Sequence, residues 1–358
     1  MKKIRTAVIG AGWWGTTAHV PALKEHPQAD LVALQHHDKN LAEKVAADFN
    51  VPRSYTSAEK LLASEDLDAV VISSTPQLHF PQAKQAIERG LHVLVEKPMT
   101  HTVAQAHELV DLAAQHKVEL LVGTTFHYHQ HVTETARLVQ SGNLGEVVMI
   151  CVLFMDEILG LYQGKSWEDF ASDHPDPEVD ANPYLTPGSN SYSDPSISGG
   201  GQIFAQVSHA AALVSFLTGD QPLDVYGRVE RAGAQVDVYD ALTFRLKKGT
   251  TVSLASAGRI GNAPRHFDVR IYGTRGVVEL ELLQGTMHHW DFATSCTEYP
   301  RLTTDEELYP RFSPAKNLVD VVLGEASNQS PGSIGLSAMQ IIEGACESSH
   351  TENCVAID

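Results

Sequence analysis

The chain has few cysteines and no long apolar run. Only four of its 358 residues are cysteines, Cys151, Cys296, Cys346 and Cys354, and none forms a CxxC pair. This spacing is not that of a disulfide framework and indicates ordinary thiols in a reducing compartment. No apolar run reaches the roughly 18 residues that a membrane-spanning helix needs. We therefore expect a cytoplasmic protein with no membrane partner.

Basic residues are also scarce. The chain has 26 Lys and Arg against 44 Asp and Glu, a formal net charge of −18. Such a surface repels phosphate backbones and anionic lipid, so we expect no nucleic-acid partner. Repeats and low-complexity segments are absent, and the apolar and charged fractions are those of ordinary globular proteins. A chain of this length is expected to form two domains.

A glycine-rich loop follows the first apolar segment, residues 4–9. Gly10, Gly12 and Gly15 form a GxGxxG pattern between this predicted strand and a predicted helix. In that context the first glycine permits a tight turn, the second lets the backbone approach a pyrophosphate, and the third lets helix and strand pack closely. The loop therefore predicts a dinucleotide site at the helix N-terminus.

The second predicted strand, residues 31–35, bears on the choice between NAD and NADP. It ends in His36 and His37, where this kind of site usually has an acid for the ribose 2′-hydroxyl. Imidazoles do not repel a 2′-phosphate, so the pair slightly favours NADP and leaves NAD open. Asp38 either reaches the ribose or caps the next helix.

Predicted strands and helices alternate through the first part of the chain. Further strands are expected at 68–73, 92–95 and 119–122, with helical patterns between them. Alternation with short connections implies a parallel, doubly wound sheet. Strand 92–95 runs directly into Glu96, Lys97 and Pro98. Because ligands of such sheets sit beyond the carboxyl ends of the strands, Lys97 is expected at a reactive site.

The second half has a different pattern. A Pro-, Ser- and Asp-rich segment at 160–198 is expected to be a loop over the site. Successive strands without helices between them indicate antiparallel pairing. Helices are expected at 132–140, 205–217, 315–323 and 335–349, and strands at 146–154, 225–231, 236–246, 251–256, 267–272 and 277–282.

The motifs AVIGAGWWG, STPQLHF and GLHVLVEKPMT occur in this order, followed by SGNLGEVV, SGGGQIFAQVSH and YGTRG. With this set the chain resembles the Gfo/Idh/MocA family of NAD(P)-dependent oxidoreductases. The resemblance implies an α/β fold with a dinucleotide-binding Rossmann domain at residues 1–123. Residues 124–358 would form a substrate-binding and oligomerisation domain with a largely antiparallel open sheet. A homodimer or homotetramer is implied.

The same resemblance implies roles for individual residues. Lys97 would be the principal acid/base and would also contact cofactor and substrate, with His209 as its partner. Many members carry an aspartate at the position of Ala205, so the usual set of three is incomplete here. Gln206, in the same turn, would orient a substrate hydroxyl. The expected cofactor contacts are Thr75, Pro76, His79 and Glu96, besides Trp13 and Trp14, which either cover the dinucleotide or pack on the sheet.

Histidines alternate in the segment His127, Tyr128, His129, Gln130, His131. No nearby acid or cysteine pair completes a coordination sphere, so no metal site is expected. His127 and Tyr128 are instead expected near the substrate. Two arginines common in the family are missing, one near Phe126 and one near Tyr192, which argues against a strongly anionic substrate.

The leading hypothesis is a dehydrogenase acting on a secondary hydroxyl of a sugar, sugar derivative or cyclic polyol. One alternative is a redox-neutral hydrolase, lyase or epimerase that recycles a bound nicotinamide. Another is a nucleotide-binding sensor without catalysis, as the loss of an acid at Ala205 suggests. The particular sugar and hydroxyl, the direction of reaction and the oligomer size do not follow from the sequence.

Overall fold

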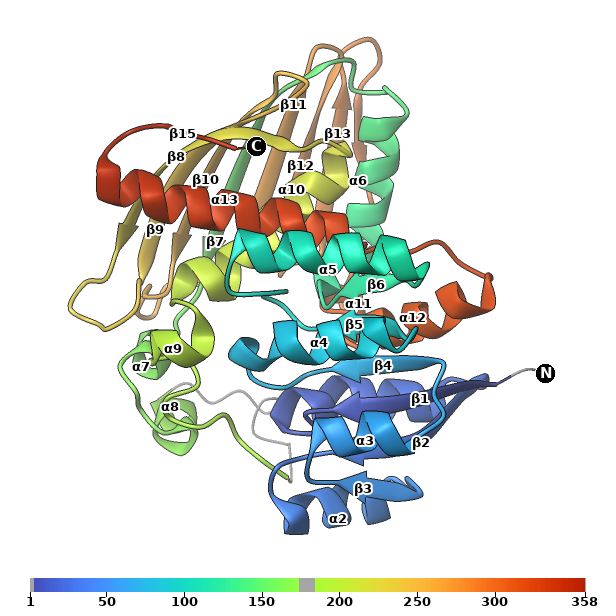
Figure 1. The fold of residues 1–358 in the computed structure, drawn as a ribbon. Helices are drawn as coiled ribbons and strands as arrows, with labels where there is room; N and C mark the ends of the chain where they lie inside the picture. Colours follow the sequence, from blue (N-terminus) through green and yellow to red (C-terminus); the bar gives the residue numbers. More distant parts are fainter. Residues whose placement is uncertain (1–2, 174–183, 358) are drawn as a thin grey trace.

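The computed structural model describes residues 3–173 and 184–357. Two β-sheets dominate the fold, a parallel sheet built from the N-terminal part and a larger mixed sheet built from the rest (Figure 1). This arrangement confirms the predicted fold class.

The first sheet has six parallel strands in the order β3-β2-β1-β4-β5-β6. Its order reverses between β1 and β4, which creates the crevice where doubly wound sheets bind ligands. The strands are β1 (Ile4–Ile9), β2 (Ala29–Gln35), β3 (Arg53–Tyr55), β4 (Ala69–Ile72), β5 (His92–Val95) and β6 (Leu120–Val122).

Both faces of this sheet are covered, and alternate strand residues enter separate cores. Val8 and Leu94 pack with α1 (Val20–Glu25) and α2 (Lys39–Asp48). On the opposite face Ile9 and Val95 belong to the core that contains α3 (Ala58–Ser64), α4 (His79–Glu88) and α5 (Val103–His116).

A helix from the far end of the chain completes the first of these layers. α12 (Ser313–Leu323) inserts Ala315, Leu318 and Val319 into the core beneath Leu94 and Leu121. It lies against β1, β4, β5 and β6, so residues beyond 123 contribute to the layer that covers the parallel sheet. The predicted domain boundary at residue 123 stays a prediction, since α12 follows this residue in the chain and packs on the N-terminal sheet.

The second sheet has nine strands in the order β14-β13-β12-β11-β7-β10-β9-β8-β15. All neighbours are antiparallel except β7 and β10, which run parallel. The strands are β7 (Val147–Met155), β8 (Pro222–Glu230), β9 (Tyr239–Leu246), β10 (Thr251–Ala257), β11 (His266–Gly273), β12 (Gly276–Glu281), β13 (Thr286–Asp291), β14 (Cys296–Glu298) and β15 (Val355–Ala356).

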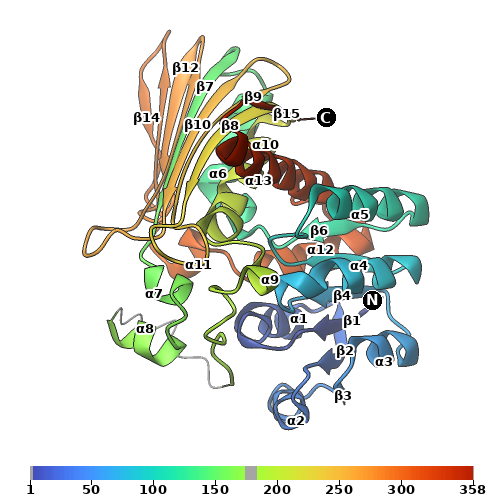
Figure 2. The same ribbon diagram turned by 60° about the vertical axis from the view of Figure 1, so that its left-hand side comes forward.

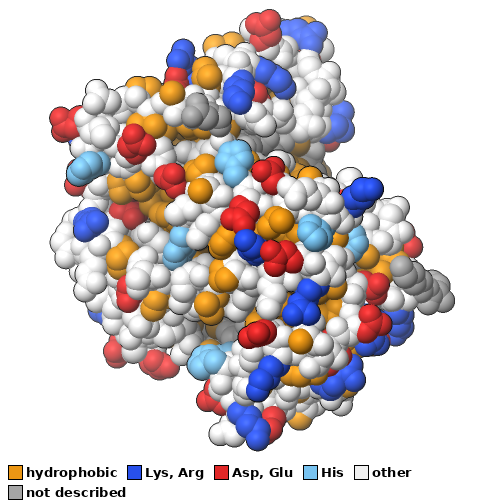
Figure 3. Space-filling view, in the orientation of Figure 1, with side chains coloured by type: hydrophobic (Ala, Val, Ile, Leu, Met, Phe, Trp, Pro, Cys, Tyr) orange, Lys and Arg blue, Asp and Glu red, His pale blue; other side chains and the backbone are white. Residues whose placement is uncertain are grey.

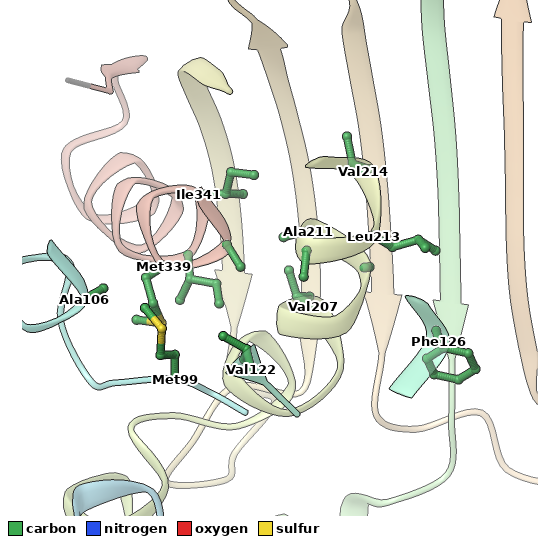
Figure 4. Close-up of a cluster of buried hydrophobic side chains, with 14 of the residues drawn as sticks. Met99, Ala106, Val122, Phe126, Val207, Ala211, Leu213, Val214, Met339 and Ile341 are labelled. Atoms are coloured by element: carbon green, nitrogen blue, oxygen red, sulfur yellow. The ribbon is translucent and has the colours of Figure 1, made fainter. Parts of the chain in front are cut away.

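Helices α6 (Gln130–Gln140), α10 (Ser208–Thr218) and α13 (Gly332–Thr351) lie on one face of this sheet (Figure 2). α13 packs on β8 along one side and on α5 along the other. Figure 4 shows the result, with Met99 and Val122 of the first sheet's side meeting Met339 of α13 and Val207 next to α10. One continuous apolar core therefore joins the two sheets.

Several sequence predictions need correction. Segment 160–198 is not a plain loop, because it contains parts of α7 (Leu159–Tyr162), all of α8 (Trp167–Asp173) and all of α9 (Pro195–Ser198), while residues 174–183 lie outside the described part. The strand expected at 236–246 begins only at Tyr239. Strands β3, β13, β14 and β15 were not anticipated.

No helix in residues 3–173 and 184–357 is long and apolar enough to cross a membrane. On the face drawn in Figure 3, acidic and basic side chains are interspersed over both parts of the molecule. The four cysteines are all free thiols.

Candidate active site

The glycine loop at the end of β1 is shaped by close backbone contacts. Gly10 has φ +84°, and a Cβ atom there would lie 2.3 Å from the backbone nitrogen of Ser74. A Cβ atom on Gly15 would lie 2.5 Å from the carbonyl oxygen of Gly10. Gly12 instead has room, since its Cβ would meet no atom closer than 3.6 Å. Two glycines are thus needed for packing, and the space beside the third, Gly12, is where a pyrophosphate is predicted to lie.

The histidine pair lies at the end of β2, beside this space. His36 is buried, and its Nδ1 atom accepts a hydrogen bond from the backbone N–H of Asp38 at 3.1 Å. The proton of the neutral ring therefore sits on Nε2, which lies 4.0 Å from the Cβ position of Gly12. Burial and the neighbouring His37 lower the pKa of His36. The exposed His37 ring lies 4.3 Å from the His36 ring.

Asp38 has the capping role. Its side chain accepts from the backbone N–H of Leu41 at 3.0 Å, which makes it the N-cap of α2. Such a carboxylate satisfies an orphan amide of the helix. The glycine loop and the histidines are the residues here that could hold a dinucleotide.

Glu96 is the centre of a buried hydrogen-bond network at the end of β5. One carboxylate oxygen accepts from Trp14 Nε1 at 2.8 Å and pairs with His19 Nε2 at 2.9 Å, and the other accepts from the Lys97 backbone N–H at 3.0 Å. Burial alone would raise the pKa of Glu96, but the His19 hydrogen bond and charge lower it overall. Gly123 is close by, where a Cβ atom would overlap the Glu96 carboxylate.

Lys97 projects from this network towards the second half of the chain. Its Nζ atom donates to the backbone carbonyl of Ala205 at 3.3 Å. Burial lowers the pKa of Lys97, and the adjacent Glu96 charge partly opposes that shift. The peptide bond to Pro98 is cis. A lysine with this environment is suited to exchange a proton.

The helix that carries Ala205 also carries His209. A π-helical turn, η4 (Ile203–Val207), leads into α10, and His209 is the second residue of α10. Its ring is buried and lies edge-on to Phe126 at 5.5 Å. The Nδ1 atom has no hydrogen-bond partner among the described residues. Burial, followed by the Lys97 and His127 charges, places the pKa of His209 well below its usual value. Lys97 and His209 thus lie at the same helical segment, and their catalytic roles stay predictions.

Other predicted contacts are engaged in packing. His79 is buried, with Nδ1 2.7 Å from the Pro98 carbonyl oxygen and Nε2 2.9 Å from that of Ser74. It thus ties the turn after β4 to the turn after β5. Thr75 is exposed and Pro76 half-buried in the turn itself, η2 (Pro76–Leu78).

The tryptophans of the loop differ in surroundings. Trp14 is bound to Glu96, whereas the Trp13 ring packs against Trp167 of α8 at 5.2 Å. Both rings are half-buried and have partners within the protein, and a role in covering the cofactor stays a prediction.

His127 and Tyr128 lie in η3 (Thr125–Tyr128), and both use their polar atoms within the protein. His127 stacks on Phe216 at 4.6 Å, and its Nδ1 lies 2.9 Å from Thr124 Oγ1. The hydroxyl of Tyr128 donates to Asn317 Oδ1 at 3.1 Å. The charge of His127 acts on His209.

The alternating histidines form no metal site. His129 caps α6, and His131 Nε2 lies 3.2 Å from the Gly285 carbonyl oxygen. Within residues 3–173 and 184–357 no group of three or more His, Cys, Asp or Glu side chains could hold a metal ion.

Sequence reasoning missed an ion pair next to Gln206. The buried Asp156, at the end of β7, binds Arg265 Nε at 2.8 Å and Gln206 Nε2 at 2.9 Å. Tyr192 and Tyr309 are near it, since the charges of Glu96 and Asp156 both act on Tyr192, and those of Glu96 and Arg265 on Tyr309. No spacing rule joins these residues, because Asp156 and Arg265 are 109 positions apart.

Family models match both parts of the chain. A family model described as "Oxidoreductase family, NAD-binding Rossmann fold" matches residues 4–124, and the Gfo/Idh/MocA C-terminal domain matches residues 132–279. The chain belongs to the Gfo/Idh/MocA family. The family resemblance inferred from the sequence motifs is thereby confirmed.

Individual members of the Gfo/Idh/MocA family align over different lengths. An uncharacterized oxidoreductase of Synechocystis is 40% identical over 149 residues, covering 42% of this chain and 40% of the relative, which is less than half its length. A D-xylose 1-dehydrogenase [NADP(+)] of Haloarcula marismortui is 24% identical over 364 residues, covering 99% and 93%. An oxidoreductase domain protein from Kribbella flavida has the same fold, with a TM-score of 0.84, 19% identity and full coverage of both chains.

Proposed function

We propose that this protein is an NAD(P)-dependent dehydrogenase that interconverts a secondary hydroxyl and a ketone on a sugar, sugar derivative or cyclic polyol, with Lys97 as acid/base. The observation that carries the proposal is the position of Lys97. It stands at the carboxyl end of β5, beside the glycine loop, with its ammonium directed to the helix that carries His209.

Each protein group has a definite part in the proposed mechanism. When bound at the glycine loop, the nicotinamide supplies the hydride acceptor. Neutral Lys97 takes the hydroxyl proton in oxidation, and its ammonium returns the proton in reduction. Burial of Lys97 favours the neutral form that oxidation needs, while Glu96 keeps the ammonium accessible. His209, held neutral by burial, offers a second hydrogen-bonding group to the substrate oxygen.

We propose NAD or NADP as the cofactor, and the histidine pair slightly favours NADP. His36 directs an N–H donor towards Gly12, and the exposed His37 adds a second imidazole that can pair with a 2′-phosphate. The Haloarcula relative is named for NADP(+) and for D-xylose, which supports a phosphorylated dinucleotide and a carbohydrate substrate for this chain.

We also propose a cytoplasmic homodimer or homotetramer with a small carbohydrate or polyol substrate. Support for self-association comes from β7, where Met149 is 39% exposed and Cys151, Leu153 and Met155 are half-buried on the face opposite the helices. Light scattering of the purified protein measures the oligomer directly, and a monomer at micromolar concentration contradicts this proposal.

The decisive experiment compares the wild type with Lys97→Met on a broad panel of sugars and polyols. We expect kcat to fall by about 10²–10⁴ and dinucleotide affinity to change little. Lys84→Met is the matched control, since Lys84 is an exposed lysine paired with Glu108 on the outer helices. The proposal fails if the wild type transfers no hydride on the panel and Lys97→Met behaves identically.

The same protein preparation distinguishes the dehydrogenase from the redox-neutral alternative. Stoichiometric nucleotide released on denaturation, together with product formation and no net change in NAD(P)H absorbance, would favour cofactor recycling. Net NAD(P)H formation that depends on added dinucleotide supports the dehydrogenase and also removes the sensor hypothesis.

A further inference from the structure

A buried carboxylate, an arginine and an amide meet at the end of β7. Asp156 is 4% exposed, and Oδ1 accepts from the Glu157 N–H at 2.9 Å and from Arg265 Nε at 2.8 Å. Oδ2 accepts from Arg265 Nη2 at 3.0 Å and from Gln206 Nε2 at 2.9 Å. All of these donors are aligned on one carboxylate, so Asp156 fixes the orientation of both neighbours.

This cluster borders the reactive lysine. Gln206 directly follows Ala205, whose carbonyl binds Lys97 Nζ, and it precedes His209 by three residues in the same helical segment. The charges of both Glu96 and Asp156 act on Tyr192, so the phenol is near both carboxylates. A substrate held by Lys97 and His209 would therefore extend towards Gln206 and Arg265.

Asp156 determines the orientation of the Gln206 amide. The amide nitrogen donates to the carboxylate, so the amide oxygen is the end that is turned away from Asp156. A side-chain amide held in this way presents an acceptor. Its natural partner is a hydroxyl donor of the substrate.

Asp156 also cancels the positive charge of Arg265. The guanidinium is 55% exposed, but two of its nitrogens bind the carboxylate in the fork geometry that matches both groups. An anionic substrate would have to compete with a carboxylate that is already in place. The sequence lacks two arginines that are common in the family, but the fold places Arg265 in this region and pairs it with Asp156.

We infer that Asp156 is a specificity-determining residue that selects uncharged polyhydroxy substrates over sugar acids and sugar phosphates. It does so by neutralising Arg265 and by presenting the Gln206 oxygen to a hydroxyl. The inference rests on the proposed dehydrogenase function and narrows its substrate class.

Matched neutral and acidic sugars test the inference. The probes are D-glucose with D-glucuronate and D-galactose with D-galacturonate, and the readout is the ratio of kcat/KM values within each pair. We expect the wild type to favour the neutral member. Asp156→Asn unpairs Arg265, so the ratio should shift towards the uronate by about tenfold or more.

A second variant should act in the opposite direction. Arg265→Met leaves the Asp156 charge uncompensated, and it should increase discrimination against the uronate while neutral sugars are still turned over. Controls come from Asp224 and Arg245, an Asp–Arg pair on β8 and β9 with similar side-chain exposure, 15% and 59% against 6% and 55%. Asp224→Asn and Arg245→Met should leave the ratio unchanged.

The outcomes distinguish the two claims. A wild-type preference for uronates, or a ratio unmoved by both site variants, overturns the role of Asp156 and leaves the dehydrogenase proposal standing. Absence of Lys97-dependent turnover on any sugar overturns the dehydrogenase proposal itself. If Asp156→Asn does not fold, Arg265→Met alone decides, because its predicted shift has the opposite sign.

Discussion

The ammonium of Lys97 donates a hydrogen bond to the backbone carbonyl of Ala205, at 3.3 Å. Ala205 lies in the π-helical turn η4, and its carbonyl also accepts from the Ser208 hydroxyl at 3.1 Å. At Ala205, where the family resemblance implies an aspartate in many members, Lys97 thus meets an uncharged acceptor. Glu96 is left as the carboxylate whose charge acts on Lys97.

The pH dependence of activity should report this arrangement. In oxidation, kcat/KM should rise with pH as the Lys97 ammonium loses its proton. Since burial lowers the pKa of Lys97, the rise should occur below the usual lysine value of about 10.4. Glu96→Gln removes the charge that opposes this shift and should move the rise to lower pH. Glu108→Gln, at an exposed position of α5, is the control, and an unmoved or raised midpoint for Glu96→Gln would contradict the account.

Cofactor choice should depend on His37. His37→Asp places a carboxylate beside the expected 2′-phosphate, and NADP affinity should fall by about tenfold or more while NAD affinity is kept or improved. Fluorescence titration with NADH and NADPH measures both. His107→Asp on α5 makes the same change of charge at an exposed site remote from the loop. Equal losses for both dinucleotides would indicate damage to the loop in place of a change in preference.

The backbone contact at Gly10 should make this position intolerant of any residue with a Cβ atom. Gly10→Ala combines a positive φ with a Cβ atom 2.3 Å from the backbone of Ser74. We expect the free energy of unfolding to fall by about 3 kcal/mol or more and dinucleotide binding to be lost. Gly90→Ala is the matched control, since Gly90 has φ +77° but nothing within 4 Å. In Gly90→Ala the free energy of unfolding should fall only by the cost of the left-handed backbone conformation, about 1–2 kcal/mol, and dinucleotide binding should be retained. Thermal melts with and without NADPH distinguish the two.

Asp240 should destabilise the protein at neutral pH. It is buried beside Asp237, and burial together with the Asp237 charge raises the pKa of Asp240 well above its ordinary value. The folded state therefore binds this proton more tightly than the unfolded chain, so the free energy of unfolding falls as pH rises above about 4 towards the folded pKa. Asp240→Asn should raise the free energy of unfolding by about 1–2 kcal/mol at neutral pH and change it little under acidic conditions.

The matched substitution Asp224→Asn should have the opposite effect on stability at neutral pH. The Arg245 hydrogen bond lowers the pKa of Asp224, so Asp224→Asn should remove stability that is present at neutral pH and lost on acidification. Urea unfolding of both variants at acidic and neutral pH provides the measurement. A neutral-pH loss of stability in Asp240→Asn would show that the ionised carboxylate is needed.

The sequence predicted those parts of the fold in which local pattern and tertiary packing agree. Buried β-branched runs such as His92–Val95 are strands in the structure, and the glycine loop and Lys97 lie where the strand ends placed them. β13 was missed because its sequence, TMHHWD, has little strand character outside its sheet. Asp156 and Arg265 were missed for another reason, since only the pairing of β7 with β11 brings distant residues together.

The position of α12 has a consequence for how the protein is made. Leu94 and Leu121 of the parallel sheet are covered by Ala315 and Leu318, which follow them by roughly two hundred residues. The ribosome therefore completes the dinucleotide-binding strands long before their covering helix exists. During translation this face of the sheet is an exposed apolar surface. A chaperone that binds apolar strands should therefore bind nascent chains that end between residues 123 and 312 and release them once α12 has emerged.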